Sequence, residues 1–381
     1  MEWKEYSLGD ISKLKYGKNV SAKLCKGPVP IFSGYRKIGT CNTINCKKNT
    51  VIVIARGAGG CGDVKLTKED CFLTNLSISV ELDKGICNAK WFYYNHLLNN
   101  LSFLNSGSAQ PQITIDSLSK YLIRIPPIII QRKIAGILSA LDSKIENNNK
   151  INANLEAQAQ ALFKSWFVDF TPFKDQPFVD SELGPIPQGW KVGKLGDLGE
   201  IVGGSTPSKS KPEYYTTHGI AWLTPKDLST SKAKFTSRGE IDITDEGYKS
   251  TSTKLMPRGS VLFSSRAPIG YLTIAKNEIC TNQGFKSLVP NGVGTGFVYY
   301  TLRHLTPQIE NRATGSTFKE ASATLMRSVE TIVPPTSILN KFEELLRPIL
   351  QFQEKKEEEN QWLAALRDTL LPKLMSGEIK L

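Results

Sequence analysis

The second half of this chain repeats the first half segment by segment, and this duplication limits the folds that are open to it. Six residues recur 187 positions later in the same order: Trp3, Lys4, Leu8, Gly9, Asp10 and Gly17 match Trp190, Lys191, Leu195, Gly196, Asp197 and Gly204. Later markers, such as Pro126-Pro127 and Pro334-Pro335, keep the order with a shift of 208. Two copies are too few for a solenoid. They predict a pseudo-twofold molecule, which suits a partner with two sites such as duplex DNA.

Composition narrows the class of protein. A chain of 381 residues predicts at least two domains. The formal charge of +12 and the pI near 9.2 favour a polyanionic partner. The seven cysteines form no Cys-x-x-Cys pair and are shared unevenly between the copies, which favours free thiols over a zinc site. With no apolar leader and no run long enough to span a bilayer, we expect a cytoplasmic protein.

Each half begins with a strand-rich segment, residues 1–125 and 186–333. Short β-branched runs bounded by Gly, Asn and Pro predict strands at 50–55, 76–82, 261–264 and 270–275. Helices are expected near 88–101 and 296–305. We therefore predict two compact α/β domains, each dominated by short strands.

Each half ends with a long helix that starts at a Pro-Pro pair, because proline is well tolerated at the first helical position. The predicted helices cover residues 126–170 and 334–381, and 171–185 is a Pro- and Asp-rich linker. Apolar residues follow a heptad-like seam over about 40 residues, or about 60 Å. In the first helix the seam positions are Ile134, Leu138, Leu141, Ile145, Asn148, Asn152, Leu155, Ala159, Leu162 and Trp166.

Both seams turn polar at their midpoints, with Asn148 and Asn152 in the first and Lys356 and Asn360 in the second. The duplicated layout favours antiparallel packing of the two helices as a coiled coil, with these polar centres meeting. Buried polar seam positions fix register at some cost in stability. The alternative is that these side chains are simply solvated or face another subunit.

Signals for catalysis are weak. Residues 57–62 read G-x-G-x-x-G, but a dinucleotide site needs a helix directly afterwards, and the sequence from Asp63 continues as a strand. A tight turn is the better interpretation, and a nucleotide-dependent enzyme that uses this turn is the alternative. No Walker A, His-Glu-x-x-His or Gly-x-Ser-x-Gly sequence occurs. We expect no catalytic residues and no metal site.

What remains is recognition by loops that combine basic, amide, hydroxyl and aromatic side chains. Arginine and lysine read guanine edges, asparagine and glutamine read adenine, and hydroxyls and amines hold phosphates. Arg56 and Arg266 stand out because both copies keep an arginine after a buried strand, although a structural salt bridge is the competing explanation. The predicted DNA-binding residues are Tyr35, Arg36, Lys37, Lys47, Lys48, Arg56, Ser108, Gln110, Gln112, Thr206, Ser208, Lys209, Lys211, Lys226, Arg266, Ser316, Thr317 and Lys319.

Several motifs carry a resemblance to a known family. The run Leu162-Phe163-Lys164-Ser165-Trp166-Phe167-Val168-Asp169-Phe170, the segment 184–190 and the Gln131-Arg132-Lys133-Ile134 helix start resemble specificity subunits of type I restriction–modification systems. The Gly-Ser to Pro-Pro passages at 107–127 and 315–335 also match. The resemblance covers essentially the whole chain.

The resemblance implies a non-catalytic subunit with two target-recognition domains, each reading half of a bipartite site in double-stranded DNA. Two antiparallel helices would set the spacer and dock two methyltransferase subunits, and restriction subunits with motor and nuclease activity would join them. S-adenosylmethionine, ATP and magnesium would belong to those partners. Our candidates for docking, on exposed helix faces, are Phe163, Trp166, Phe167 and Phe170, with packing at the bundle end as the alternative. A scaffold for methylation without a nuclease also stays open.

Overall fold

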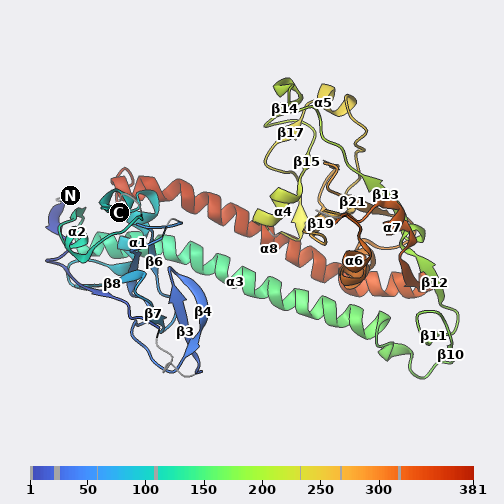
Figure 1. The fold of residues 1–381 in the computed structure, drawn as a ribbon, viewed down its shortest axis with the longest axis horizontal. Coiled ribbons are helices and arrows are strands. Elements are labelled where there is room, and N and C mark those ends of the chain that lie inside the picture. The colour runs from blue at the N-terminus through green and yellow to red at the C-terminus, as the bar shows by residue number, and fades with distance from the viewer. Residues whose placement is uncertain are drawn as a thin grey trace. The chain divides into compact units, whose positions relative to one another are not determined.

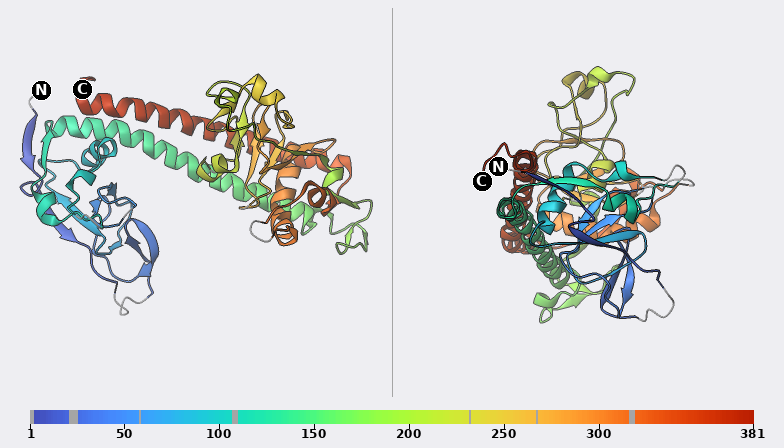
Figure 2. Two further views of the ribbon diagram at one scale, coloured as in Figure 1. Left: turned by 45° about the horizontal axis from the view of Figure 1, so that its top comes forward. Right: turned by 90° about the vertical axis from the view of Figure 1, so that its left-hand side faces the viewer.

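The computed structural model describes residues 3–20, 26–57, 59–106, 110–231, 233–266, 268–315 and 319–381. The chain forms two compact units, which we call unit 1 (Met1–Glu146 with Asn360–Leu381) and unit 2 (Asn147–Glu359). Each unit combines one strand-rich domain with segments of two long helices, α3 (Ile128–Phe167) and α8 (Thr336–Ser376). Figure 1 labels these elements, and Figure 2 gives two further views.

Unit 1 is built on a four-stranded antiparallel sheet with strand order β2-β8-β5-β6, a three-stranded sheet β4-β3-β7 and the pair β1-β9. The strands are β1 (Lys4–Ser7), β2 (Ser12–Tyr16), β3 (Val29–Ser33), β4 (Arg36–Cys41), β5 (Val51–Ile54), β6 (Val64–Leu66), β7 (Phe72–Leu73), β8 (Ser77–Leu82) and β9 (Leu122–Ile125). The short helices are α1 (Ala89–Leu98), η1 (Ser102–Leu104) and α2 (Ile115–Ser119).

Unit 2 has a five-stranded sheet with order β13-β21-β18-β19-β16 and four two-stranded pairs, β10-β11, β12-β22, β14-β17 and β15-β20. The strands are β10 (Phe178–Val179), β11 (Ile186–Pro187), β12 (Lys191–Lys194), β13 (Gly199–Gly203), β14 (Tyr215–Thr216), β15 (Trp222–Leu223), β16 (Phe235–Thr236), β17 (Asp242–Ile243), β18 (Val261–Phe263), β19 (Leu272–Ala275), β20 (Cys280–Thr281), β21 (Lys286–Pro290) and β22 (Glu330–Val333). The helices are η2 (Thr171–Phe173), η3 (Leu195–Asp197), η4 (Pro212–Tyr214), α4 (Pro225–Ser231), α5 (Asp245–Lys249), α6 (Thr295–Arg312) and α7 (Ala323–Ser328).

The two strand-rich domains share one framework, as the duplication predicts. The antiparallel pairs β1-β9 and β2-β8 correspond to β12-β22 and β13-β21, and the parallel pair β3-β7 corresponds to β15-β20. Gly17 and Gly204 occupy the same place, because a Cβ atom at either would lie 2.1 Å from a carbonyl oxygen of the neighbouring strand connection. The repeated glycines therefore mark a point where two backbone segments cross without room for a side chain.

The predicted secondary structure is confirmed where the local pattern is strongest. Both long helices begin directly after their Pro-Pro pairs, and α1 and α6 lie in the two segments expected to be helical. Asn88 caps α1 by accepting hydrogen bonds from the backbone N–H groups of Lys90 and Trp91. The expected linker at 171–185 contains the η2 turn and strand β10. The division into compact units falls within both long helices rather than at their ends.

Within unit 1 the segments of α3 and α8 pack antiparallel. Ile134 and Leu138 of α3 share a buried cluster with Leu371 and Leu374 of α8. Further along α3, Asp142 forms an ion pair of 2.8 Å with Arg367 of α8. Residue numbers therefore rise along one helix as they fall along the other.

Within unit 2 the helix segments are also antiparallel, and the polar positions meet. The fully buried Asn148 donates a hydrogen bond of 3.0 Å from its Nδ2 atom to Glu359. Gln353 of α8 donates from Nε2 to the carbonyl of Asn152 over 3.3 Å. Asn148 and Asn152 thus contact polar residues of α8, Glu359 and Gln353, which are neighbours of the predicted partners Lys356 and Asn360. The antiparallel packing predicted from the seams is confirmed within each unit.

A buried charged cluster joins the strand-rich domain of unit 2 to both helix segments. The Lys234 ammonium, 8% exposed, donates hydrogen bonds of 2.6 Å to Glu156 of α3, 2.6 Å to the Tyr300 hydroxyl and 2.9 Å to Gln353 of α8. Glu357 of α8 accepts from the backbone N–H groups of Lys234 and the next residue. These charged groups are largely removed from solvent, and they satisfy one another's hydrogen bonds and charge.

The described helices include none whose length and apolar character would suit a passage through a bilayer.

Candidate nucleic-acid interface

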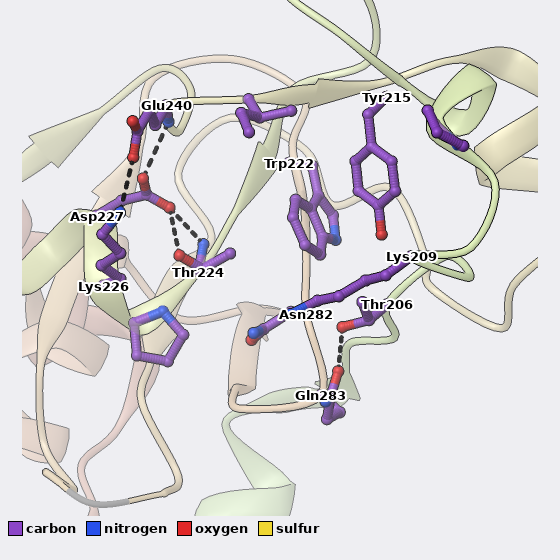
Figure 3. A pocket seen from close by; sticks show the side chains of 13 residues that line it. Thr206, Lys209, Tyr215, Trp222, Thr224, Lys226, Asp227, Glu240, Asn282 and Gln283 are labelled. Atoms are coloured by element: carbon purple, nitrogen blue, oxygen red, sulfur yellow. Dashed lines mark hydrogen bonds and ion pairs between the residues drawn. The ribbon is translucent and has the colours of Figure 1, made fainter.

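Unit 2 contains a cleft of about 670 Å³ on its strand-rich domain, which we call the unit 2 cleft (Figure 3). Four stretches of the sequence form its walls, at 206–215, 222–227, 240–241 and 282–283, and they include three of the predicted DNA-binding residues. The lining residues are Thr206, Lys209, Pro212, Tyr215, Trp222, Thr224, Pro225, Lys226, Asp227, Glu240, Ile241, Asn282 and Gln283. The fold thus brings together loops that the sequence analysis considered separately.

Two aromatic side chains form one wall of the unit 2 cleft (Figure 3). The rings of Tyr215 and Trp222 lie 6.0 Å apart in an edge-on arrangement. Each polar tip is held by the same loop, because the Tyr215 hydroxyl donates to the carbonyl of Pro207 and the Trp222 indole N–H donates to that of Ser205. These bonds fix the loop that carries Thr206 and Lys209 against a rigid apolar surface.

Asp227 organises the opposite wall of the cleft (Figure 3). Its carboxylate accepts hydrogen bonds of 2.7 Å from both the backbone N–H and the hydroxyl of Thr224, and one of 2.9 Å from the backbone N–H of Glu240. The exposed Lys226 lies beside it and pairs with Glu240 over 3.2 Å. Asp227, in the first turn of α4, therefore ties the residues around Thr224 to the segment that carries Glu240, and Lys226 pairs with Glu240 beside it.

The floor of the cleft carries two amides, Asn282 and Gln283. The Asn282 Oδ1 atom accepts from the backbone N–H of Gly284, and Gln283 accepts from the hydroxyl of Thr206. Both side-chain oxygens thus accept hydrogen bonds within the protein, and the amide nitrogens of Asn282 and Gln283 are donors of the kind that can reach acceptors on base edges. Lys286, just beyond them, donates to the carbonyl of Gln283 and so connects the floor to the neighbouring edge of the sheet.

At that edge, Arg266 follows strand β18 and forms an antiparallel bridge with Glu320, which also bridges Thr314. The Nε atom of Arg266 donates to Glu320 over 2.9 Å, and Lys286 lies 3.4 Å from the other carboxylate oxygen. Both Arg266 and Glu320 keep partly exposed side chains. The structural salt bridge weighed as an alternative for Arg266 is therefore present, and its exposure leaves the pair accessible.

Unit 1 repeats this arrangement with different chemistry. Arg56 follows β5 and bridges Gln112, which stands at the position of Glu320. The Arg56 guanidinium lies over the ring of Tyr16, 5.9 Å from its centroid. Among the described residues its Nε atom has no hydrogen-bond partner. Arg56 thus lacks the carboxylate that holds Arg266. We call Arg56 with Gln112, and Arg266 with Glu320, the bridge pairs.

Other predicted residues of unit 1 lie elsewhere. Tyr35 occupies the β3–β4 turn and donates to the carbonyl of Leu66, and burial raises the pKa of its phenol. Arg36 and Lys37 follow it as exposed residues of β4. Lys47 and Lys48 precede β5, whereas Arg56 follows it, so the structure does not bring these lysines together with the bridge pair.

The remaining predicted DNA-binding residues fall into three groups. Ser208 and Lys211 belong to the loop at the unit 2 cleft, where Lys211 contacts the Tyr214 hydroxyl at 3.0 Å. Gln110 and Lys319 are exposed next to the bridge pairs. Ser108, Ser316 and Thr317 lie outside the described residues.

The expectation that the aromatic residues at the end of α3 lie on an exposed face is wrong for Phe163 and Phe167. They are 7% and 6% exposed and belong to the core of unit 2. Phe167 packs against Phe342 of α8 with ring centroids 4.7 Å apart, and Trp166 and Phe170 are half-buried around them. Their helical spacing places these rings on the face that contacts α8 and α6, so packing at the bundle end explains them.

The glycine-rich stretch at 57–62 connects β5 to β6, so a strand follows it rather than a helix. Gly57, Gly60 and Gly62 have positive φ angles, and a Cβ atom at Gly62 would lie 2.3 Å from the backbone nitrogen of Ser102. The tight-turn interpretation fits this geometry. Among the described residues there is no group of three or more His, Cys, Asp or Glu side chains placed to hold a metal.

Several residues of this interface were not predicted from the sequence, notably Asn282, Gln283, Lys286 and Glu320. One signal was available, because Thr281-Asn282 repeats Thr74-Asn75 in the first copy. The carbonyl oxygen of Asn282 lies 2.1 Å from where a Cβ atom of Gly204 would be, so Asn282 lies where the two backbone segments cross. Glu320 gave no local signal, since its role depends on Arg266, which lies 54 residues earlier.

Comparison with known proteins agrees with this architecture. The family model for the type I restriction modification DNA specificity domain matches residues 1–157 and 187–360. The chain is 38% identical to the MjaIX specificity subunit of Methanocaldococcus jannaschii, over 49% of this chain and 44% of that protein. It is 26% identical to the HindI specificity subunit of Haemophilus influenzae, over 99% of this chain and the full length of that protein.

The fold also matches a solved structure, the S subunit of a type I restriction-modification system from M. genitalium. The TM-score is 0.67 at 19% identity, with 98% of this chain and 96% of that chain covered. The chain spans less than half of the first relative and all of the second. Because the family model covers most of both copies, the chain belongs to the family of type I restriction–modification DNA specificity subunits.

Proposed function

We propose that this chain is the DNA-reading subunit of a type I restriction–modification complex, with each strand-rich domain reading one half of a bipartite site. The proposal rests on an arrangement that both units share. In each unit an arginine follows an interior strand of the main sheet and forms a backbone bridge with an equivalent polar residue, Arg56 with Gln112 and Arg266 with Glu320. The net charge of +12 supports contact with a polyanion. Family membership supports the same role.

The helix pair would set the spacer between the half-sites. A stiff connection between two readers fixes their distance and their rotational phase along a duplex that repeats every ~34 Å. Two half-site contacts then reinforce each other, since the second forms at high effective concentration. The antiparallel contacts found within each unit, such as Asp142 with Arg367 and Asn148 with Glu359, support this role.

Methyltransferase subunits would dock on the exposed faces of the helices, and restriction subunits would join that assembly in the cytoplasm. Because Phe163 and Phe167 are buried, we move the docking proposal to Leu345 and Phe352 of α8, which lie seven positions apart and are 51% and 44% exposed. Replacing Phe352 by Asp should weaken co-purification with the methyltransferase subunit. An unchanged yield of complex would contradict this assignment.

In this proposal the chain performs no chemistry. S-adenosylmethionine, ATP and magnesium would act in the partner subunits. The turn at 57–62 leads into β6, so it lacks the helix N-terminus that a dinucleotide site uses. Isothermal titration of the isolated chain with S-adenosylmethionine and with NAD should show no binding, and tight binding of either would favour an enzyme instead.

The decisive test is genome-wide mapping of adenine methylation in cells that express the chain with its methyltransferase subunit. We expect a split motif that disappears when the chain is deleted, and a mismatch in either half should cost about 1–3 kcal/mol per base pair. A methylome without any split motif that depends on the chain would sink the proposal. Adding the restriction subunit then separates a nuclease system from a scaffold for methylation alone.

A further inference from the structure

The bridge pairs of the two units have the same backbone and different side chains. In unit 1, Ser106 N–H donates to the carbonyl of Gln112 over 3.0 Å, and in unit 2, Thr314 N–H donates to that of Glu320 over 3.2 Å. The next residues, Ile113 and Ala321, each donate over 2.8 Å to the residue before the bridge arginine. The framework is therefore constant, and the residue beside the arginine is the variable part.

The side chain at this position decides which atoms of the arginine are available. In unit 2 the Glu320 carboxylate accepts from Nε of Arg266. This interaction uses the Nε–H donor and restricts the plane of the guanidinium, whose two terminal nitrogens carry the remaining four N–H donors. Two parallel donors are the fork that matches the O6 and N7 acceptors of guanine. In unit 1 the neutral Gln112 holds no charge against Arg56 and offers an amide of its own.

Stability does not explain the pair in unit 2. Arg266 and Glu320 are 46% and 34% exposed, and exposed ion pairs of this kind contribute little. A carboxylate on an edge that faces DNA repels the phosphates. Selection would therefore favour replacing such a residue unless it contributes to recognition. Here Arg266 at 2.9 Å and Lys286 at 3.4 Å surround the carboxylate, so the cluster keeps a net positive charge.

We propose that the bridge pair is a specificity-determining element, and that Arg266 oriented by Glu320 reads a G·C base pair in the half-site of unit 2. This inference rests on the proposed function of the chain. Glu320 acts as a positioning residue for Arg266, and its carboxylate is also the acceptor suited to a neighbouring cytosine amino group. Gln112 gives unit 1 a different preference on the same backbone.

The test replaces Glu320 by Gln, the residue that unit 1 uses, in the complete complex. Methylation is measured on a library of split sites that covers every base of both half-sites. We expect discrimination at one G·C position of the unit 2 half-site to fall about 5- to 150-fold, the range that corresponds to 1–3 kcal/mol for a base contact. All other positions should keep their preferences.

Two further variants keep the test decisive. Glu200→Gln makes the same change in the exposed Lys254 pair of the same unit and should alter no position of the motif. Gln112→Glu should alter only the half-site of unit 1. A motif unchanged in Glu320→Gln, or a uniform loss of methylation at all sites, overturns the inference. Absence of any split motif with the unaltered chain would instead refute the proposed function itself.

Discussion

Replacing Lys234 by Met should destabilise the attachment of the strand-rich domain of unit 2 to its helix segments. Methionine keeps the apolar stem and removes the charge, so Glu156, only 21% exposed, loses its 2.6 Å partner. Burial disfavours ionisation of Glu156. The charge and hydrogen bond of Lys234, together with hydrogen bonds from Gln160 and Gln353, outweigh burial, and the pKa of Glu156 falls from 4.5 to about 2. That difference corresponds to about 3 kcal/mol.

The two partners respond to burial in opposite directions. Desolvation is the largest influence on Lys234 and lowers the pKa of its ammonium, so burying that charge costs stability. The pKa shift of Glu156 is the relevant one for the single substitution, because Glu156 is the buried charge that remains, with the half-exposed Arg303 at 3.3 Å as its other ion-pair partner. Breaking a buried pair from one side typically costs about 3–5 kcal/mol, whereas replacing both partners by apolar groups is often nearly neutral. The double variant Lys234→Met with Glu156→Met should therefore recover most of the loss.

Native-state hydrogen exchange followed by mass spectrometry measures the loss of stability region by region, without the assumption that both units unfold together. Peptides from β16 and α6 should exchange about 10²-fold faster or more in the single variant. Lys254→Met is the matched control, because that lysine and its partner Glu200 are 66% and 60% exposed and should matter little. If Lys234→Met exchanged like this control, or if the double variant were as unstable as the single one, the reasoning would be refuted.

Three further predictions follow from the same structure. Gly204→Ala should lower the melting temperature, because its Cβ atom would lie 2.1 Å from a carbonyl oxygen and such overpacking costs about 1–3 kcal/mol. Gly136→Ala in α3 is the control: its Cβ atom would meet open space, and the change should stabilise the helix by about 0.5–1 kcal/mol. Unit 2 should lose stability as the pH falls from about 4.5 towards 2, because the ionised Glu156 is the stabilising form, and urea titrations of Glu156→Gln should lack this dependence. Inserting four residues near Asn148 adds about 6 Å of helix, so methylation maps should show a recognised spacer that is longer by about two base pairs. Loss of one half-site instead would contradict the proposal that the helices set the spacer.

Several features of the fold were predictable because they depend on neighbours in the sequence. The Pro-Pro pairs and the heptad-like spacing predict where α3 and α8 start and which faces are apolar. The shared framework of the two strand-rich domains follows from the duplication, and the polar midpoint at Asn148 predicted its contact across the helix pair. Loop composition also identified Thr206, Lys209 and Lys226, which line the unit 2 cleft.

Other features depend on which distant segments pack together, and no local pattern encodes that. The sequence determined two similar strand-rich domains, two long helices and an arginine after each central strand. Only the tertiary structure decided that Glu320 meets Arg266, that Lys234 is buried against Glu156 78 positions earlier, and that Phe167 faces the core instead of a partner. The physical reason is that periodicity fixes which face of an element is apolar, whereas the surface that covers it is selected by the packing of the whole chain.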